Sequence, residues 1–326
     1  MNQIAFILGS TTVYWYSVVL AMAVLSGICF FFAFSQHEEI PALHASATVL
    51  LGMVLSLLLA RFLYWYSRPE IFQSMMQAMG ITATGRLTLT GGFLGCGLAV
   101  LLVGKFCGNF AKLLDCMSIA GCGAIALGRL GNFFTASDRG QILTEMINLP
   151  WAYPVMNAAS GQPEYRLATF LFQAIIAGIL FAVLVWLFFH REKHGIHHGD
   201  LTVLFLLVYC ASQVLLDSTR YDSLYFRSNG FVSIVQVLSA VALAFGIVFF
   251  SVRAVKARGL QKWMIVFWVA IAAMFGVAGY MEYFVQRHGR LAFFAYATME
   301  HCLVGIVVLS ILLWRSALKK PEIIGE

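Results

Sequence analysis

The sequence predicts an all-α polytopic membrane protein. Of its 326 residues, 61% are hydrophobic and only 11% are charged. The apolar runs are about 20 residues long, which is the length that a helix needs to cross the hydrocarbon core of a bilayer. No lysine or arginine precedes Arg61, so the chain lacks the basic start of a cleaved signal peptide. We therefore expect the first apolar run to remain as a membrane helix.

Nine apolar segments are predicted to span the membrane, and most of the links between them are short. The segment 69–80 is short and partly amphipathic, so we expect a helix lying at the interface. The one long connection, 135–166, carries prolines, glycine and aromatic residues, which is typical of an irregular interfacial loop. The predicted spans are 13–34, 45–66, 87–104, 113–134, 167–189, 201–218, 231–252, 263–285 and 292–314.

The lysines are sorted to one side of this topology. If the amino terminus lies outside, every lysine falls on the cytoplasmic side and the outer loops hold arginine only. Cytoplasmic loops are enriched in basic residues, so we expect an outer amino terminus and a cytoplasmic carboxyl terminus. The lysines are Lys105, Lys112, Lys193, Lys256, Lys262, Lys319 and Lys320, and the outer-loop arginines are Arg68, Arg86, Arg139, Arg166, Arg220, Arg227, Arg287 and Arg290.

Composition also limits the partners. A net charge of +6 in so hydrophobic a chain suits anionic lipid headgroups, and no soluble basic domain is present to bind nucleic acid. The seven cysteines mostly lie inside apolar runs without C-x-x-C spacing, which favours small core residues. The histidines of HREKHGIHHGD, residues 190–200, are interrupted by Arg191 and Lys193, which repel a cation. A solvated cytoplasmic loop is favoured over a metal site there, and we expect no metal and no cofactor.

Arginines in or beside apolar helices are the main candidates for function. A cation in the apolar region costs about 2.5–3.5 kcal/mol on insertion scales, so Arg61 and Arg129 should face a polar cavity or a partner. Arg129 lies among glycines in GRLGNFFTASDRG, and Arg220 lies at the outer end of another helix, beside Asp217 and Asp222. Because a guanidinium matches phosphate bidentately, Arg129 and Arg220 are candidates for a phospholipid headgroup site. Pairing with acids or snorkelling is favoured for Arg68, Arg86, Arg287 and Arg290.

These residues also carry a family resemblance. GRLGNFF resembles the signature G-R-I-G-N-F-x-N-G-E-x-x-G of prolipoprotein diacylglyceryl transferases, and five further features are similar to that family's motifs in the same order. The match covers about residues 13–252. It implies a seven-helix diacylglyceryl-transferase-like body, 1–252, followed by a two-helix extension, 253–326. The further features are WYS at Trp15–Ser17, ARFLY with Arg61 and Tyr64, TGGFLG at Thr90–Gly95, Arg220 after the sixth helix, and VSIVQVLS with Gln236.

The resemblance implies an enzyme of the bacterial cytoplasmic membrane with its site facing outward. Such enzymes move the diacylglyceryl group of phosphatidylglycerol onto the cysteine thiol of a prolipoprotein signal peptide. The expected partners are therefore phosphatidylglycerol, or another anionic phospholipid, and that signal peptide. Arg129 and Arg220 are predicted to stabilise the departing phosphate, and Asn132 to hydrogen-bond the ester or glycerol oxygens. The residues expected to bind substrate are Tyr16, Arg61, Thr90, Gly91, Gly92, Gly131, Arg139, Gly140 and Gln236.

Two positions depart from the family pattern. Thr90 stands where the family has histidine, and Ser137 stands where it has glutamate. A threonine hydroxyl is no general base near neutral pH, and losing a base costs roughly 10²–10⁴ in rate. Asp138 is a candidate substitute. Two alternatives therefore stay open: a related transferase with another lipid or acceptor, and a non-catalytic membrane protein that keeps the phospholipid site.

The extension holds acids where acids are costly. Glu282 lies near the outer end of the eighth predicted helix, and Glu300 and His301 lie in the outer half of the ninth. Because a carboxylate is expensive to expose to lipid tails, we expect these three residues to face the bundle and to approach one another. They either neutralise Arg287 and Arg290 or belong to an accessory site.

Overall fold

The computed structural model describes residues 3–9, 11–72, 74–80, 87–143, 150–157, 160–226, 229–288 and 292–318. Within these ranges, nine helices are long and apolar enough to cross a membrane, which confirms the all-α polytopic fold. Each predicted span overlaps one of them. They are α1 (Trp15–His37), α2 (Ala42–Ser67), α4 (Leu89–Cys107), α5 (Phe110–Leu130), α6 (Thr169–Phe189), α8 (Asp200–Ser218), α9 (Ile234–Arg258), α10 (Lys262–His288) and α11 (Ala292–Leu318).

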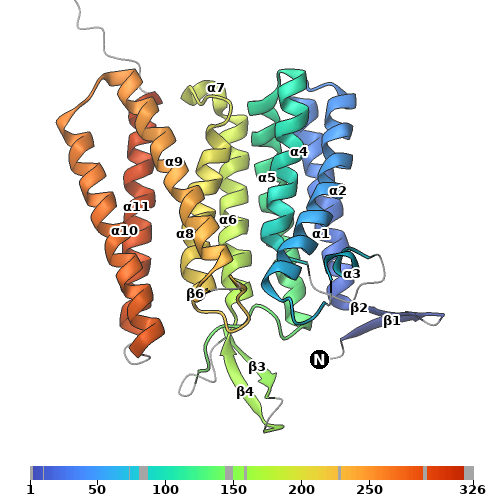
Figure 1. Cartoon of the computed structure of the whole chain (residues 1–326). Coiled ribbons are helices and arrows are strands. Elements are labelled where there is room, and N and C mark those ends of the chain that lie inside the picture. The colour runs from blue at the N-terminus through green and yellow to red at the C-terminus, as the bar shows by residue number, and fades with distance from the viewer. Residues whose placement is uncertain are drawn as a thin grey trace, which may run out of the picture.

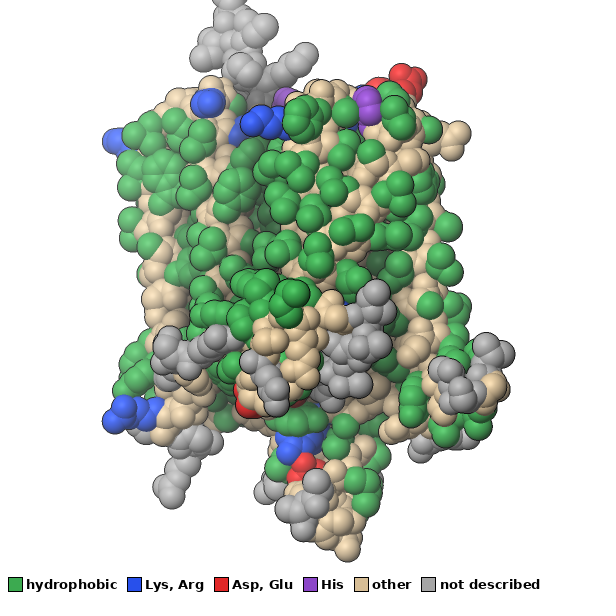
Figure 2. Space-filling model, turned by 45° about the vertical axis from the view of Figure 1, so that its right-hand side comes forward, with side chains coloured by type: hydrophobic (Ala, Val, Ile, Leu, Met, Phe, Trp, Pro, Cys, Tyr) green, Lys and Arg blue, Asp and Glu red, His purple; other side chains and the backbone are tan. Residues whose placement is uncertain are grey.

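The helices stand side by side in one bundle, with α8 near its centre and α10 at its edge (Figure 1). In the most apolar stretch of α8, 67% of the residues are buried, against 17% in α10. α11 packs on α9 and α8, and α10 packs on α11. Figure 2 shows hydrophobic side chains over the middle of the molecule and charged side chains near its two ends, as a protein surrounded by lipid tails requires.

Shorter elements lie at the ends of the bundle. Two are helices, α3 (Met75–Met79) and α7 (Arg191–His194), and η1 (Gly131–Phe134) is a 3₁₀ turn that continues α5. The strands form three antiparallel hairpins: β1 (Ile4–Leu8) with β2 (Thr11–Tyr14), β3 (Ala152–Met156) with β4 (Pro163–Leu167), and β5 (Tyr225–Phe226) with β6 (Asn229–Ser233).

Two sequence predictions for the connections need correction. The interfacial helix expected over 69–80 is confined to α3, and the connection 135–166 contains the hairpin of β3 and β4. Pro154 and Pro163 argue against strands, because proline removes a ladder hydrogen bond. A hairpin of only two strands has two open edges, however. A proline can stand at a position where the backbone N–H would face away from the partner strand, and no ladder hydrogen bond is then lost.

Glycines bring α4 against α2. A Cβ added at Gly91 would lie 2.4 Å from the Cα of Ala60, and one added at Gly95 would lie 2.3 Å from the Cα of Ser56. Only glycine permits this approach. Gly91 therefore packs α4 closely against α2, and its approach to a lipid stays a prediction. A Cβ added at Gly92 would meet no atom of another described helix within 4 Å.

An ionic network lies at the end of the bundle that carries α7. Arg191 donates from Nη2 to Oδ2 of Asp115 at 2.7 Å and from Nη1 to Oε1 of Glu38 at 2.8 Å. Asp115 also accepts the backbone N–H of Gly199 at 2.8 Å, and the N–H and hydroxyl of Thr202, both at 2.9 Å. Arg191 is only 8% exposed, so the expectation of a simply solvated loop is wrong for this residue.

The same network continues into the last helices. Asp200 accepts a hydrogen bond from Arg253 on α9 and another from Nε1 of Trp314 on α11, the latter at 3.1 Å. Five helices are thereby joined through buried carboxylates. We call the network the α7 cluster, which comprises Glu38, Asp115, Arg191, Asp200 and Arg253.

The acids of the extension are only partly oriented as expected. Glu282 is 7% exposed and faces the bundle, which confirms its prediction. Glu300 and His301 are exposed, so the expectation that they face the bundle is wrong. The reason is the rotation of α11, which turns Met299 and Leu303 inward and leaves the two intervening polar residues on another face.

Candidate functional site

Arg129 and Arg220 meet at one carboxylate. Arg129 lies in the last turn of α5, and Arg220 lies two residues beyond the end of α8. Nη1 of Arg129 is 2.5 Å from Oδ2 of Asp138, and Nη2 of Arg220 is 2.6 Å from Oδ1 of the same group. The three side chains are 11%, 14% and 10% exposed. A guanidinium group from the end of α5 and one from the segment that follows α8 thus converge on Asp138.

The loop that follows η1 fixes Asp138. Its φ of +55° is a left-handed conformation that aspartate tolerates better than most residues. Its backbone N–H donates to Oδ2 of Asp222 at 3.1 Å, and its carbonyl accepts from the N–H of Phe170 at 3.2 Å. The side-chain amide of Asn132 donates from Nδ2 to Oδ2 of Asp138. The carboxylate is therefore held by two guanidinium groups and one amide.

These contacts keep Asp138 ionised. Burial raises the pKa of this carboxyl, but Arg129 and Arg220 outweigh burial and lower the pKa to about 2. A carboxylate with so low a pKa is a weak base near neutral pH. The structure therefore argues against Asp138 as the substitute general base.

Arg220 is surrounded by acids. It donates to Oδ1 of Asp217 at 3.2 Å and, from Nε and Nη2, to Oδ1 of Asp222 at 3.1 and 3.0 Å. Burial lowers the pKa of this guanidinium, but Asp138, Asp217 and Asp222 raise it above its ordinary value, so it stays charged. We call this network the site cluster, which comprises Arg129, Asn132, Asp138, Asp217, Arg220 and Asp222.

Gln236 supports the site cluster indirectly, through Ser233. With Ser233 it forms a capping box at the start of α9, and its Nε2 donates to the carbonyl of Val214 at 3.3 Å. Ser233 in turn donates its hydroxyl to Asp217, the partner of Arg220. Gln236 is 5% exposed and contributes to the support of Asp217, while its role in substrate binding stays a prediction.

Arg139 is enclosed within the protein. It is 0% exposed, and its Nη2 donates to the carbonyls of Asn132 and Thr135 at 2.8 and 2.7 Å. Its guanidinium lies 4.2 Å from the ring centroids of both Tyr153 and Phe170. Burial lowers the pKa of Arg139. In this position Arg139 braces the loop that carries Asp138, and the substrate contact that the sequence indicated stays a prediction.

Gly131 and Gly140 also shape this loop. A Cβ at Gly131 would lie 3.3 Å from Cδ2 of Tyr16, so the ring of this predicted substrate residue lies against the start of η1. A Cβ at Gly140 would lie 2.7 Å from Oγ1 of Thr169, which no side chain tolerates without movement. Both glycines therefore act through close packing.

The remaining predicted site residues form a second group, on α2 and α4. Nη1 of Arg61 donates to the carbonyls of Ala78 and Gly80 at 3.0 and 2.7 Å, which fastens the end of α3 to α2. Thr90 is half-buried in the first turn of α4. Among the contacts of the described residues, none joins Arg61 or Thr90 directly to the site cluster.

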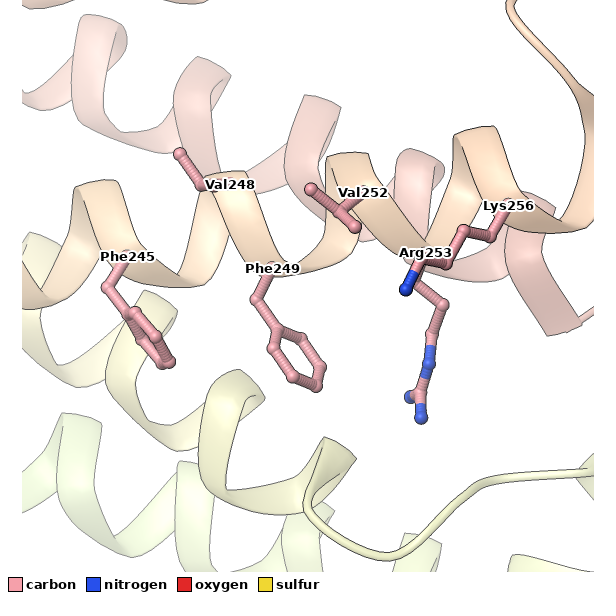
Figure 3. A pocket seen from close by; sticks show the side chains of 6 residues that line it. All are labelled: Phe245, Val248, Phe249, Val252, Arg253 and Lys256. Carbon is pink, nitrogen blue, oxygen red and sulfur yellow. The ribbon is translucent and has the colours of Figure 1, made fainter.

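A groove of about 370 Å³ lies elsewhere, along α9 (Figure 3). The groove is lined mainly by apolar side chains, with Arg253 and Lys256 at one end. None of the predicted site residues lines it. It is therefore separate from the candidate site. The lining residues are Phe245, Val248, Phe249, Val252, Arg253 and Lys256.

Sequence reasoning missed two residues that join the loop to the end of α8. Tyr221 donates its hydroxyl to the carbonyl of Ala136 at 2.6 Å, and its N–H to the carbonyl of Arg139 at 3.2 Å. The guanidinium of Arg166 lies 4.5 Å from the Tyr221 ring centroid. No sequence signal distinguishes these residues. In contrast, the S-x-x-Q spacing of Ser233 and Gln236 is a recognisable capping box.

Some other basic residues used in the sequence predictions remain to be placed. Arg68 pairs with Glu70 at 3.6 Å on the exposed surface, which confirms the expected ion pair. Other residues used in the sequence predictions lie outside the described ranges: Arg86, Arg227, Arg290, Lys319 and Lys320.

Comparisons with known proteins show which family the chain matches. A family model described as prolipoprotein diacylglyceryl transferase matches residues 3–252, which include the site cluster and leave α10 and α11 outside. Three proteins named phosphatidylglycerol–prolipoprotein diacylglyceryl transferase are similar to the chain. The one from Bacillus licheniformis is 26% identical over 273 residues, or 81% of this chain and 96% of that protein. Those from Enterococcus faecalis and Synechococcus elongatus are 27% and 29% identical, over 78% and 74% of this chain and 91% and 83% of theirs.

Proposed function

The chain belongs to the prolipoprotein diacylglyceryl transferase family, and on that premise we propose that it transfers diacylglyceryl from phosphatidylglycerol to the cysteine thiol of a prolipoprotein signal peptide. The observation that carries the proposal is the convergence of Arg129 and Arg220 on one anionic group beside Asn132. A site that holds a carboxylate with two guanidinium groups has the donors that a phosphate diester needs.

The reaction is a displacement at carbon. The thiolate sulfur forms a bond to the terminal glyceryl carbon of the diacylglycerol moiety, and the bond between that carbon and the phosphate oxygen breaks. Glycerol phosphate leaves with the electron pair, and the thiol proton passes to solvent. The largest electrostatic demand is the charge on the departing oxygen, which fixed guanidinium groups meet best. We assign this role to Arg129 and Arg220.

Asp138 holds the place of the phosphate before substrate binds. Two guanidinium groups repel each other, and the carboxylate between them keeps them at the spacing that a phosphate requires. An incoming phosphate displaces the carboxylate from at least one guanidinium group. Asn132, which then loses its bond to Asp138, is free to donate to a glycerol or ester oxygen.

The general base is the weak point of the site. Thr90 and Ser137 stand where the family has histidine and glutamate, and Asp138 is too acidic to replace them. A thiol with a pKa of about 8.5 is nevertheless a few per cent ionised at neutral pH. We therefore propose a slow transferase that relies on the intrinsic ionisation of the acceptor thiol.

A second candidate is a non-catalytic phospholipid-binding protein. Asp138, Asp217 and Asp222 already satisfy the guanidinium of Arg220, and Thr90 cannot take a proton. Such a protein binds phosphatidylglycerol without turnover.

We further propose that the site faces outward across a bacterial cytoplasmic membrane, with the amino terminus outside and the carboxyl terminus cytoplasmic. The support is the placement of the lysines. Lys105 lies in the last turn of α4, Lys112 in the first turn of α5 and Lys193 on α7. These segments lie at the end of the bundle opposite the hairpin of β3 and β4 (Figure 1). A reporter enzyme that is active only outside the cytoplasm, inserted at Gly161, should be active. Activity of the reporter after Gly108 instead would reverse the orientation.

Complementation tests the function directly. The full chain should restore growth to a bacterial strain depleted of its own diacylglyceryl transferase, whereas the Arg129→Lys variant, expressed at the same level, should not. Purified protein should transfer labelled diacylglyceryl from phosphatidylglycerol to a lipobox peptide. Binding of phosphatidylglycerol without any transfer decides for the second candidate. Transfer from a different lipid or to a different thiol identifies a related transferase.

A further inference from the structure

The two helices beyond the family match touch the segments that hold the site cluster. Glu282 on α10 accepts the hydroxyl proton of Ser218 at 2.6 Å, through Oε2. The hydroxyl of Tyr296 on α11 accepts from Nε2 of Gln141 at 2.7 Å and donates to the carbonyl of Ser218 at 3.4 Å. The extension therefore has polar contacts with the body at this end of the bundle.

The positions of these partners matter. Ser218 is the last residue of α8 and precedes Arg220 by two residues. Gln141 follows Asp138 by three residues, on the loop that Arg139 braces. The single hydroxyl of Tyr296 thus connects the two chain segments whose meeting brings Arg220 to Asp138.

Among the residues that the structure describes, Glu282 forms no ion pair with an arginine. Its second oxygen, Oε1, accepts from Nε2 of Gln286 at 3.0 Å, whereas the guanidinium of Arg287 lies 5.9 Å from the ring centroid of Tyr283. Glu282 is 7% exposed and bonds a hydroxyl and an amide. Burying a carboxylate with neutral donors only is costly, and an apolar side chain would fill the same space without this cost. A functional role for the hydrogen bond between Glu282 and Ser218 would explain why a carboxylate is buried at this position.

We propose that Glu282 and Tyr296 are positioning residues for Arg220, acting through Ser218 and Gln141. They hold the end of α8 against the loop of Asp138, so that the guanidinium of Arg220 stays at the phosphate position. The inference rests on the proposed function only in assigning Arg220 to the phosphate. It makes the extension a part of the site, not merely two more membrane anchors.

The chain offers a matched control at the other end of α11. Trp314 donates one hydrogen bond from Nε1 to Asp200 of the α7 cluster at 3.1 Å. Tyr296→Phe removes the two hydrogen bonds of its hydroxyl to the body, and Trp314→Phe removes one hydrogen bond between α11 and the body, but only Tyr296 lies beside the site. A purely structural extension responds to both in the same way.

The experiment measures hydrogen exchange and turnover in the full-length protein. The amide of Tyr221 donates to the carbonyl of Arg139, so its exchange rate reports whether the two segments remain together. In Tyr296→Phe and Glu282→Leu we expect exchange over residues 219–223 to rise about tenfold, since a local restraint is lost. Trp314→Phe should leave it within about twofold. Glu282→Gln keeps an acceptor oxygen and should rescue most of the effect.

Turnover supplies the second arm. In Tyr296→Phe and Glu282→Leu, kcat should fall about threefold to tenfold while KM for the lipobox peptide is unchanged, because Arg220 acts on the leaving phosphate. Unchanged exchange in both variants overturns the proposal, as does increased exchange with unaltered kcat. If the wild-type protein shows no turnover, the proposed transferase function fails. The inference is then judged by exchange together with phosphatidylglycerol affinity, which must weaken in Tyr296→Phe and not in Trp314→Phe.

Discussion

The site cluster and the α7 cluster are both buried networks of arginine and aspartate, but their carboxylates are held differently. Asp115 accepts two backbone N–H groups from the start of α8, in addition to a hydroxyl and Arg191. Among the residues that the structure describes, the carboxylate of Asp138 accepts from side chains only, those of Arg129, Asn132 and Arg220. The first arrangement caps the rigid end of a helix. The second can release its carboxylate when three side chains rotate.

This difference separates a structural network from a candidate binding site. A carboxylate fixed by backbone donors cannot be exchanged for a ligand without unfolding the helix end. A carboxylate held by guanidinium and amide groups can be exchanged for a phosphate of similar geometry. We therefore expect changes in the site cluster to alter binding and rate, and changes in the α7 cluster to alter stability.

The largest expected effect is on rate, in Arg129→Lys. An ammonium group keeps the charge but loses the planar fork that engages phosphate. We expect transfer to the lipobox peptide to fall by about 10²–10³, as for other preorganised donors to a developing anion, with little change in apparent melting temperature in detergent. Arg191→Lys is the matched control and should lower the melting temperature while sparing kcat. The opposite pattern in the two variants would remove the distinction between the clusters.

The second effect is on stability, in Asp115→Asn. This change removes one of the two carboxylates that pair with Arg191, which keeps its ion pair with Glu38. Breaking a buried ion pair completely costs about 3–5 kcal/mol, which is the upper bound for this variant. We expect a clear fall in apparent melting temperature and a kcat within about twofold of wild type for the folded fraction. A variant with normal stability and lost turnover would assign the α7 cluster to the chemistry.

Much of the fold follows from the sequence because a bilayer imposes long apolar helices. The hairpin of β3 and β4 does not, since Pro154 and Pro163 oppose a strand locally and only the open edges of a two-stranded hairpin accommodate them. The rotation of α11 was also missed, because Glu300 and His301 lie together between the buried residues Met299 and Leu303, and local pattern alone does not say which face packs on α9.

The candidate site, like the fold, was predicted only in part from the sequence. Arg129 and Arg220 stand out in the sequence because charges in apolar helices are expensive. The role of Asp138 does not stand out, since it depends on a positive φ and on contacts between residues 84 positions apart. The contact of Glu282 with Ser218 spans 64 positions and is equally invisible. The sequence identifies the unusual charges, whereas the structure is needed to identify their partners.

A smaller effect is expected in Asp138→Asn, where the affinity for phosphatidylglycerol should rise and kcat should fall. Without the internal carboxylate, the guanidinium groups of Arg129 and Arg220 lack a competing anion, so phosphatidylglycerol should bind several-fold more tightly. The same groups then lose their fixed spacing, and kcat should fall about tenfold. Titration of the lipid by intrinsic fluorescence and assay of the same preparation measure both quantities. Weaker binding in this variant would show that Asp138 is not displaced by the phosphate.

The pH dependence of stability sharpens the same comparison. The pKa of Asp138 is lowered to about 2 from a value of 3.8, so its ionised form stabilises the folded state above about pH 4. That contribution is lost as the pH falls from about 4 to about 2. The difference in melting temperature between wild type and Asp138→Asn should be constant from pH 5 to 8 and should shrink below pH 4. A difference that changes near neutral pH would mean that another group titrates.

The smallest expected effect tests whether the α2–α4 group shares the chemistry of the site cluster. Thr90→His places an imidazole in the first turn of α4, beside the open space at Gly92. With a pKa near 6.5, a histidine there can accept the thiol proton. We expect kcat to rise several-fold to about tenfold near neutral pH, and Thr90→Asn, which adds no base, to leave it unchanged. The gain should vanish in the Thr90→His, Arg129→Lys double variant, because faster thiol ionisation helps only while the departing phosphate is stabilised. A gain that persists without Arg129 would mean that the histidine acts on a different step, and no gain at all would mean that another residue already ionises the thiol.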